Sequence, residues 1–182
     1  IGPYGAMLND GSEYRGDYQV PRAALRDFHA RRLELLADEC DLLALETIPQ
    51  LREVEALLEL VAGCPIPVWL SVSARGSRLR SGESAAEAFS MASQVPEVIA
   101  VGANCIDPDD AAELAELAHS ASGKPAVIYP NSGEEWDAGR WRGTASAPAD
   151  VTDWVARGAL LVGGCCRVTP EHIGAMAESL GS

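Results

Sequence analysis

Short apolar runs alternate with longer amphipathic segments along most of this chain. The runs are each about the length of a buried strand and fall at residues 42–45, 68–72, 98–102, 126–129 and 160–162. Helical periodicity and helix-start signals cover residues 21–39, 51–61, 84–93, 108–120, 149–157 and 170–180. Strict alternation of almost wholly apolar strands with helices predicts a parallel sheet with helices packed outside it.

Polar or reactive residues follow several of the predicted strands, among them Glu46, Asn104 and Asn131. A site built from the carboxyl ends of many parallel strands is typical of a (β/α)8 TIM barrel. The five runs, with a fragment of a sixth strand at Ile1, fall short of eight, and a complete barrel needs about 250 residues. We therefore interpret residues 1–182 as one α/β domain, the C-terminal portion of a TIM barrel with about five to six of its eight βα units and its N-terminal strands missing.

Three of the five cysteines stand where such a fold collects its chemistry. Cys105 ends one apolar run, and Cys165 and Cys166 follow a pair of glycines after the last run. Catalytic zinc sites use three protein ligands and keep a fourth position open. The pattern predicts a Zn²⁺ ion held by these three thiols, and the alternative is that they are buried, inert thiols. We assign that second role to Cys40 and Cys64, which do not end strands.

The net charge and the number of cysteines indicate which partners and which cellular compartment to expect. With 27 acidic and 14 basic residues the net charge is −13, which opposes binding to phosphate backbones or anionic lipid. No apolar stretch approaches the ~20 residues of a membrane span. An odd number of cysteines in metal-like positions suits a reducing compartment. We therefore expect a cytoplasmic protein with no nucleic-acid and no membrane partner.

Several short motifs occur in a fixed order along the whole chain. They are Gly2-Pro3-Tyr4-Gly5-Ala6, Glu46-Thr47-Ile48-Pro49, Gly102-Ala103-Asn104-Cys105, Tyr129-Pro130-Asn131-Ser132-Gly133-Glu134 and Gly163-Gly164-Cys165-Cys166-Arg167. Together they resemble the zinc-dependent homocysteine S-methyltransferase family, and within it the branch that uses S-methylmethionine or S-adenosylmethionine. The resemblance implies Zn²⁺ on the three cysteines and transfer of a methyl group from a sulfonium donor to the zinc-bound thiolate of homocysteine, giving methionine.

The same resemblance implies that Glu46 contacts the homocysteine amino group, although a carboxylate near a helix N-terminus is a common alternative. Asn131 and the loop 136–141 either line the donor pocket, where aromatic faces attract a sulfonium, or form a surface lid. Asn104 either orients the metal site through a hydrogen bond or only satisfies backbone groups at its strand end.

Methyl transfer between two sulfurs needs positioning rather than a general base. The histidines agree with this, because His29 and His119 fall on helical patterns and are expected at the surface. Two functions from different classes follow. The first is a zinc-dependent homocysteine S-methyltransferase, and the alternative is a non-catalytic zinc-binding barrel fragment that needs a partner segment.

Overall fold

The centre of the molecule is a parallel sheet with the strand order β1-β2-β5-β6-β9. The computed structural model describes residues 1–137, 140–148 and 150–181. The strands of this sheet are β1 Leu43–Ile48, β2 Val68–Val72, β5 Val98–Asn104, β6 Ala126–Tyr129 and β9 Ala159–Val162. The predicted parallel α/β architecture is confirmed. Within the described residues β1 and β9 do not pair with each other, so the sheet is an open one, consistent with part of a barrel.

Ile1 lies along the outer edge of β1. Its backbone nitrogen donates to the carbonyl oxygen of Ala44 at 2.6 Å, and its carbonyl oxygen accepts from the nitrogen of Glu46 at 3.0 Å. Two bonds placed on either side of Leu45 in this way are the pattern of a parallel ladder. The fragment of a further strand predicted at Ile1 therefore occupies the place of a parallel neighbour of β1.

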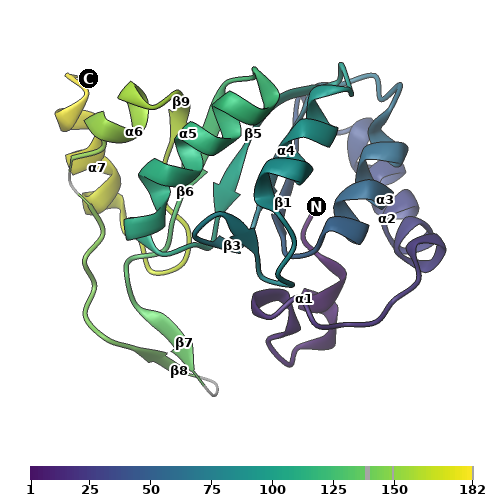
Figure 1. The fold of residues 1–182 in the computed structure, drawn as a ribbon, viewed down its shortest axis with the longest axis horizontal. Coiled ribbons are helices and arrows are strands. Elements are labelled where there is room, and N and C mark those ends of the chain that lie inside the picture. The colour runs from purple at the N-terminus through teal and green to yellow at the C-terminus, as the bar shows by residue number, and fades with distance from the viewer. Residues whose placement is uncertain (138–139, 149, 182) are drawn as a thin grey trace.

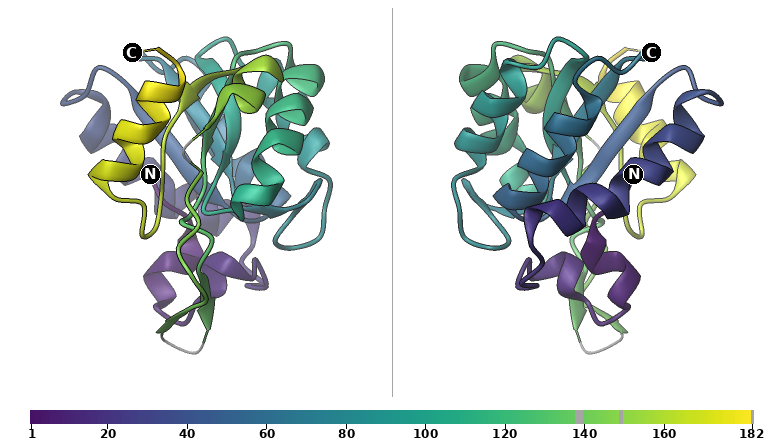
Figure 2. Two further views of the ribbon diagram at one scale, coloured as in Figure 1. Left: turned by 90° about the vertical axis from the view of Figure 1, so that its left-hand side faces the viewer. Right: turned by 90° about the vertical axis from the view of Figure 1, so that its right-hand side faces the viewer.

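Helices cover one face of the sheet, as Figure 1 shows. They are α3 Leu51–Val61, α4 Ala85–Ser93, α5 Ala111–Ser122 and α6 Thr152–Ala156, with α2 Arg22–Ala37 packed against α3 and α7 Pro170–Ser179 following β9. In the side views of Figure 2, α4 and α5 lie on one side of the sheet and α7 lies toward the other, so the structure curls at its ends. The predicted helix 149–157 begins at Ala149, which is outside the described residues. None of the helices in the described ranges has the length and apolar character needed to cross a bilayer.

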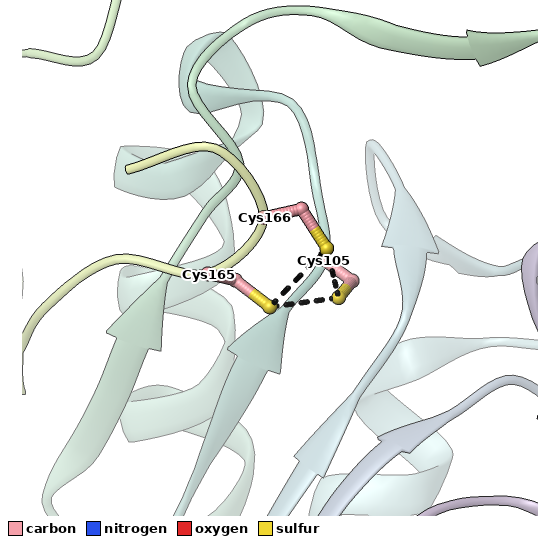
Figure 3. Close-up of side chains that lie close together, drawn as sticks. All are labelled: Cys105, Cys165 and Cys166. Carbon is pink, nitrogen blue, oxygen red and sulfur yellow. Dashed lines mark hydrogen bonds between the residues drawn. The ribbon is translucent and has the colours of Figure 1, made fainter. Parts of the chain in front are cut away.

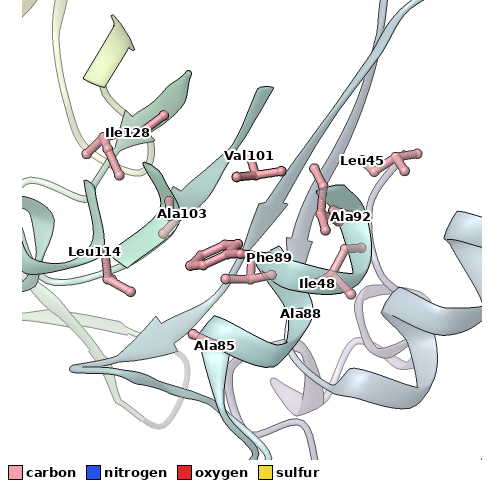
Figure 4. Packing of buried hydrophobic residues seen from close by; sticks show 14 of the residues in the cluster. Leu45, Ile48, Ala85, Ala88, Phe89, Ala92, Val101, Ala103, Leu114 and Ile128 are labelled. Atoms are coloured by element: carbon pink, nitrogen blue, oxygen red, sulfur yellow. The ribbon is translucent and has the colours of Figure 1, made fainter. Parts of the chain in front are cut away.

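The core lies between the sheet and this row of helices. Phe89 of α4 is fully buried at its centre, among side chains such as Leu45, Val101 and Leu114 (Figure 4). Because successive strand residues point to opposite faces, the neighbours of these strand residues face the other side of the sheet. Glu46 of β1 is one of them, which places its carboxylate on the face that the helices do not cover.

Short helices, turns and hairpins lie at the rim formed by the carboxyl ends of the strands, in the lower part of Figure 1. They are α1 Tyr4–Leu8, the 3₁₀ turns η1 Ser12–Tyr14 and η2 Pro108–Asp110, the hairpin of β3 Ala74–Arg75 with β4 Arg78–Leu79, and the hairpin of β7 Glu135–Asp137 with β8 Arg140–Arg142. The sequence pattern predicted loops at these hairpins and at α1, since elements of two to five residues are too short to show a period.

The expectation that His29 lies at the surface is wrong. Its ring is fully buried, and Nε2 lies 2.7 Å from Oε1 of Glu53 on α3. The same carboxylate accepts hydrogen bonds from the backbone nitrogen of Tyr4 at 2.7 Å and from the hydroxyl of Tyr18. His29 was expected to face solvent because it lies on a helical pattern. Since α2 packs on α3, this side chain instead faces α3. The buried carboxylate thereby ties the N-terminal rim segment to the body of the protein. His119, in contrast, is exposed as expected.

Candidate metal centre

Three thiols meet at the carboxyl-end rim of the sheet. The Sγ atom of Cys105 lies 2.9 Å from that of Cys165 and 3.9 Å from that of Cys166, and the latter two are 4.0 Å apart. Figure 3 shows Cys105 at the end of its strand and the other two on the loop after β9, with all three sulfurs converging. Within the described residues, this trio is the group whose side chains could hold a metal ion. The cysteines selected from their strand-end positions are thus brought together.

The backbone around each thiol explains this convergence. Cys105 adopts a left-handed conformation with φ of 51°, which turns the chain sharply after β5. On the other side, the backbone nitrogen of Cys165 donates to the carbonyl of Pro130 at 2.8 Å, and that of Cys166 donates to Oδ1 of Asn131 at 3.1 Å. Asn131, predicted as a substrate contact, therefore holds the cysteine loop in place as well as lining the adjacent cleft.

The spacing of the sulfurs fits a tetrahedral zinc site. Thiolates bound to Zn²⁺ at about 2.3 Å in tetrahedral geometry have their sulfurs about 3.8 Å apart. The two distances from Cys166, 3.9 Å and 4.0 Å, agree with this value. The 2.9 Å pair of Cys105 and Cys165 would have to open by about 0.9 Å. Cys40 and Cys64 take no part in the cluster and pack at the edge of the core, as expected of inert thiols.

The three thiols do not share charge equally. Hydrogen bonds from Cys105 and Cys165 lower the pKa of Cys166 to about 3, and a further bond from Tyr14 adds to this effect. Hydrogen bonds to Cys165 and Cys166, together with burial, raise the pKa of the Cys105 thiol. The bond from Cys105 lowers the pKa of Cys165, but the bond to Cys166 and burial outweigh it and leave that pKa raised. Of the three thiols, Cys166 is therefore the one that ionises most readily.

Three polar side chains contact these sulfurs. The sequence predicted no role for two of them, and for Asn104 it left two alternative roles. The hydroxyl of Tyr14 lies 3.7 Å from Sγ of Cys166, and Thr47 donates to Sγ of Cys105 over 3.8 Å. Asn104 donates to Sγ of Cys165 over 3.8 Å and exchanges two 2.7 Å hydrogen bonds with Thr47. Asn104 thus contacts both a thiol and a backbone group. Thr47 stands inside the motif Glu46-Thr47-Ile48-Pro49, which was the available signal for it.

Glu46 lies on the uncovered face of the sheet in a short chain of hydrogen bonds. The indole nitrogen of Trp69 donates to the hydroxyl of Tyr129 at 3.2 Å, and that hydroxyl donates to Oε2 of Glu46 at 3.1 Å. Burial raises the pKa of Tyr129, so the phenol stays protonated and remains a donor at neutral pH. One carboxylate oxygen of Glu46 is thereby fixed in orientation next to the strand end that carries Thr47.

A cleft of about 1080 Å³ opens beside the thiols, at the upper end of the size range of small-molecule sites. Its lining includes the aromatic residues Tyr14 and Trp141 and also Asn131, whose side chain accepts a hydrogen bond from the backbone nitrogen of Cys166. Its charged lining comprises Asp10, Glu13, Asp107, Asp109, Asp110 and Glu134 with Arg15, Arg75 and Arg80. Acidic groups outnumber basic ones there, so the cleft favours a cationic ligand. Of the predicted loop 136–141, residues 138–139 lie outside the described part of the chain.

Comparison with known proteins places this geometry in a family. The profile of the homocysteine S-methyltransferase family matches residues 1–180. The chain belongs to the homocysteine S-methyltransferase family. A homocysteine S-methyltransferase from Escherichia coli is 42% identical over 97% of this chain and 60% of its own length. The relative YbgG from Bacillus subtilis is 40% identical over 95% of this chain and 58% of its own length.

Solved structures of the family agree with the fold. The homocysteine methyltransferase MmuM from Escherichia coli, in its metallated form, superposes with a TM-score of 0.85 at 40% identity, over 100% of this chain and 59% of that one. A member of the family thus binds metal. The chain spans about three fifths of the length of the relatives it matches, 60% and 58% for the two sequences above.

Proposed function

We propose that this chain carries the metal centre of an enzyme that transfers a methyl group from a sulfonium donor to homocysteine and so forms methionine. The observation that carries the proposal is the cluster of three thiols at the strand-end rim of a chain of this family. Cys105, Cys165 and Cys166 would hold Zn²⁺ and leave one position open. Bound there, zinc supplies the Lewis acid that lowers the pKa of a homocysteine thiol and keeps its sulfur nucleophilic at neutral pH.

Glu46 would bind the other end of homocysteine. The half-buried phenol of Tyr129 already donates to one of its carboxylate oxygens, so the carboxylate is held in one orientation before substrate arrives. The other oxygen would accept a charge-assisted hydrogen bond from the substrate ammonium. Fixing both ends of the amino acid converts thiol attack into an oriented displacement, in which placement supplies most of the rate.

The methyl donor would enter through the cleft beside the thiols. S-Methylmethionine and S-adenosylmethionine both carry a sulfonium, which the acidic lining attracts and which aromatic faces such as Tyr14 and Trp141 stabilise. In the transfer the homocysteine sulfur bonds to the methyl carbon, while the electron pair of the breaking bond stays on the donor sulfur. The donor leaves as a neutral thioether, and the thiol proton of homocysteine passes to solvent.

The same chain would form one domain, residues 1–182, within a (β/α)8 barrel. Within the described residues the sheet is open, so further parallel strands could pair at its edges and close a barrel. A reducing compartment such as the cytoplasm would keep the free thiols available for metal. The non-catalytic alternative, a zinc-binding fragment that needs a partner segment, makes a different prediction in the assay below.

The test is methyl transfer by the whole encoded polypeptide, loaded with zinc and supplied with homocysteine and S-methylmethionine carrying a ¹³C-labelled methyl group. We expect labelled methionine by mass spectrometry, its loss in Cys166→Ser, and its retention in Cys64→Ser, which removes a thiol outside the cluster. Zinc binding without labelled methionine from either S-methylmethionine or S-adenosylmethionine would favour the non-catalytic alternative.

A further inference from the structure

The carbonyl oxygen of Cys105 is held by two side chains from the neighbouring strand and its hairpin. Ser73, fully buried just after β2, donates to this oxygen at 3.4 Å. Arg80, directly after β4, donates to the same oxygen through Nη2 at 3.2 Å and to the Ser73 hydroxyl through Nε at 3.2 Å. The backbone nitrogen of Arg80 also donates to the Ser73 carbonyl at 3.1 Å. The three groups, the Arg80 guanidinium, the Ser73 hydroxyl and the Cys105 carbonyl, are therefore each hydrogen-bonded to the other two, and we call this arrangement the triangle.

That carbonyl belongs to a residue in an unfavourable backbone conformation. The left-handed region is unfavourable for a residue with a Cβ atom, and Cys105 adopts it with φ of 51°. Such a conformation persists only when surrounding groups fix it. If Cys105 relaxed to negative φ, its side chain would leave the direction in which it meets Cys165 and Cys166. The triangle supplies the restraint, and the charge on the guanidinium strengthens the bond to the carbonyl.

The rim has a second turn of the same construction. Thr47 is also left-handed, with φ of 65°, and its backbone nitrogen and hydroxyl are held by the side chain of Asn104 at 2.7 Å each. At each of these two strained positions a polar side chain from another element of the rim binds the backbone. Cys105 and Thr47 thus share one feature, a left-handed backbone that is hydrogen-bonded by a polar side chain.

We propose that Arg80 is a positioning residue for the metal centre, acting with Ser73 through the carbonyl of Cys105. This rests on the proposed metal binding by the three thiols. Arg80 also lines the cleft, and a contact with the carboxylate of an amino-acid donor is the competing role. The two roles separate experimentally, because a positioning role changes how metal is bound, whereas a carboxylate contact changes the KM for the donor.

The experiment replaces zinc by Co²⁺ in the whole encoded polypeptide, since thiolate-to-cobalt charge-transfer and d–d bands report the number of thiolates and the tetrahedral geometry. Arg80→Met should change these bands and weaken zinc binding, measured by chelator competition, by about 10–100-fold, the usual effect of losing a partner that orients a ligand. Arg80→Lys, which keeps the charge and one donor, should restore part of the affinity. Arg78→Met, on the same hairpin, is the matched control and should leave both readouts unchanged.

Wild-type bands and zinc affinity in Arg80→Met would overturn the proposal, and a raised donor KM as the only change would assign Arg80 to the carboxylate. If Arg80→Met does not fold, Arg80→Lys and Ser73→Ala carry the test, and unchanged zinc affinity in both would overturn it. A wild-type protein that binds no cobalt through thiolates overturns both this inference and the proposed metal site. A protein that binds cobalt normally but transfers no methyl group refutes the proposed reaction alone.

Discussion

At the scale of single residues, the thiol cluster has an uneven charge before any metal arrives. Hydrogen bonding keeps Cys166 ionised, whereas the pKa values of Cys105 and Cys165 are raised above their ordinary range. A divalent ion that takes three thiolates must therefore displace protons from two of them. Protons and metal compete for the same sulfur atoms, which makes the affinity for metal depend on pH.

The sign of that dependence follows from the raised pKa values. At a pH below these pKa values Cys105 and Cys165 are both protonated, so zinc binding releases about two protons. The apparent zinc affinity should therefore rise by about two orders of magnitude for each unit of pH near neutrality. Chelator competition between about pH 6 and pH 8 measures this slope. Cys64→Ala should show the same slope as the unmodified protein. An affinity independent of pH would contradict the charge distribution described here.

Glu46 offers a test of substrate binding that leaves the metal untouched. Glu46→Gln keeps the shape of the side chain and its contact with Tyr129 but removes the charge. Homocysteine binding should weaken by about 1.5–3 kcal/mol, the contribution of a charged hydrogen bond. Calorimetry on the zinc-loaded protein gives the affinity, and elemental analysis should show unchanged zinc. Equal affinity of the two forms would remove Glu46 from the binding site.

Sequence reasoning reached some of these residues and missed others for a physical reason. The three cysteines were found because the carboxyl ends of parallel strands share a rim, so position along the chain predicts proximity in space. The burial of His29 was missed because it depends on Glu53 from another helix. The contacts of Tyr14 and Arg80 with the cysteines likewise depend on turns and hairpins that place distant segments together.

At the scale of elements, the strand that leads to Cys105 approaches its neighbour β6 closely at one glycine. A Cβ atom at Gly102 of β5 would lie 1.8 Å from the carbonyl oxygen of Val127 on β6. Gly102 has an ordinary φ, so the restriction comes from space and not from backbone conformation. The pairing of β5 with β6, and with it the position of Cys105 relative to the loop after β9, depends on the absence of this side chain.

Gly102→Ala should therefore lower the free energy of unfolding by about 1–3 kcal/mol or more, because the two strands must move apart. The midpoint of urea unfolding of the whole encoded polypeptide measures the change. Gly174→Ala is the matched control, since a Cβ there meets nothing within 4 Å. Gly174 lies inside α7, so its substitution should stabilise by roughly 0.5–1 kcal/mol. Equal midpoints for the two variants would refute the steric account.

The central strands and long helices were predictable from periodicity, with boundaries differing by a few residues. Strand β5, expected at 98–102, continues to Asn104, because polar residues at a buried strand end break the apolar pattern without ending the backbone pairing. The rim hairpins were not predictable, because their strands of two or three residues depend on contacts with the rest of the rim. These hairpins contribute residues to the wall of the cleft, so the sequence indicated the thiol cluster better than the cleft.

At the scale of the whole molecule, apolar side chains remain exposed on the last strand of the sheet. Leu160 is 72% exposed and Leu161 is 40% exposed, and within the described residues the outer edge of β9 pairs with no other strand. An apolar strand edge of this kind associates with other chains unless it is covered. The net charge of −13 opposes association but does not remove the exposed surface.

Produced alone, residues 1–182 should self-associate and bind a hydrophobic dye. Leu160→Lys, which places a charge on the exposed edge, should reduce the association measured by light scattering. Leu36→Lys on α2, also an exposed leucine but away from the sheet, should have little effect. A monomer with a sharp cooperative melt would show that the sheet edge is stable as it stands.

The zinc content of purified protein tests the central claim most directly. The whole encoded polypeptide, expressed in zinc-containing medium and dialysed, is analysed for zinc per chain as wild type, as Cys165→Ala and as Cys64→Ala. We expect one zinc ion per chain in the wild type and in Cys64→Ala, and its loss in Cys165→Ala, because two thiolates leave the ion without a third protein ligand. Stoichiometric zinc in Cys165→Ala would contradict a metal centre formed by Cys105, Cys165 and Cys166.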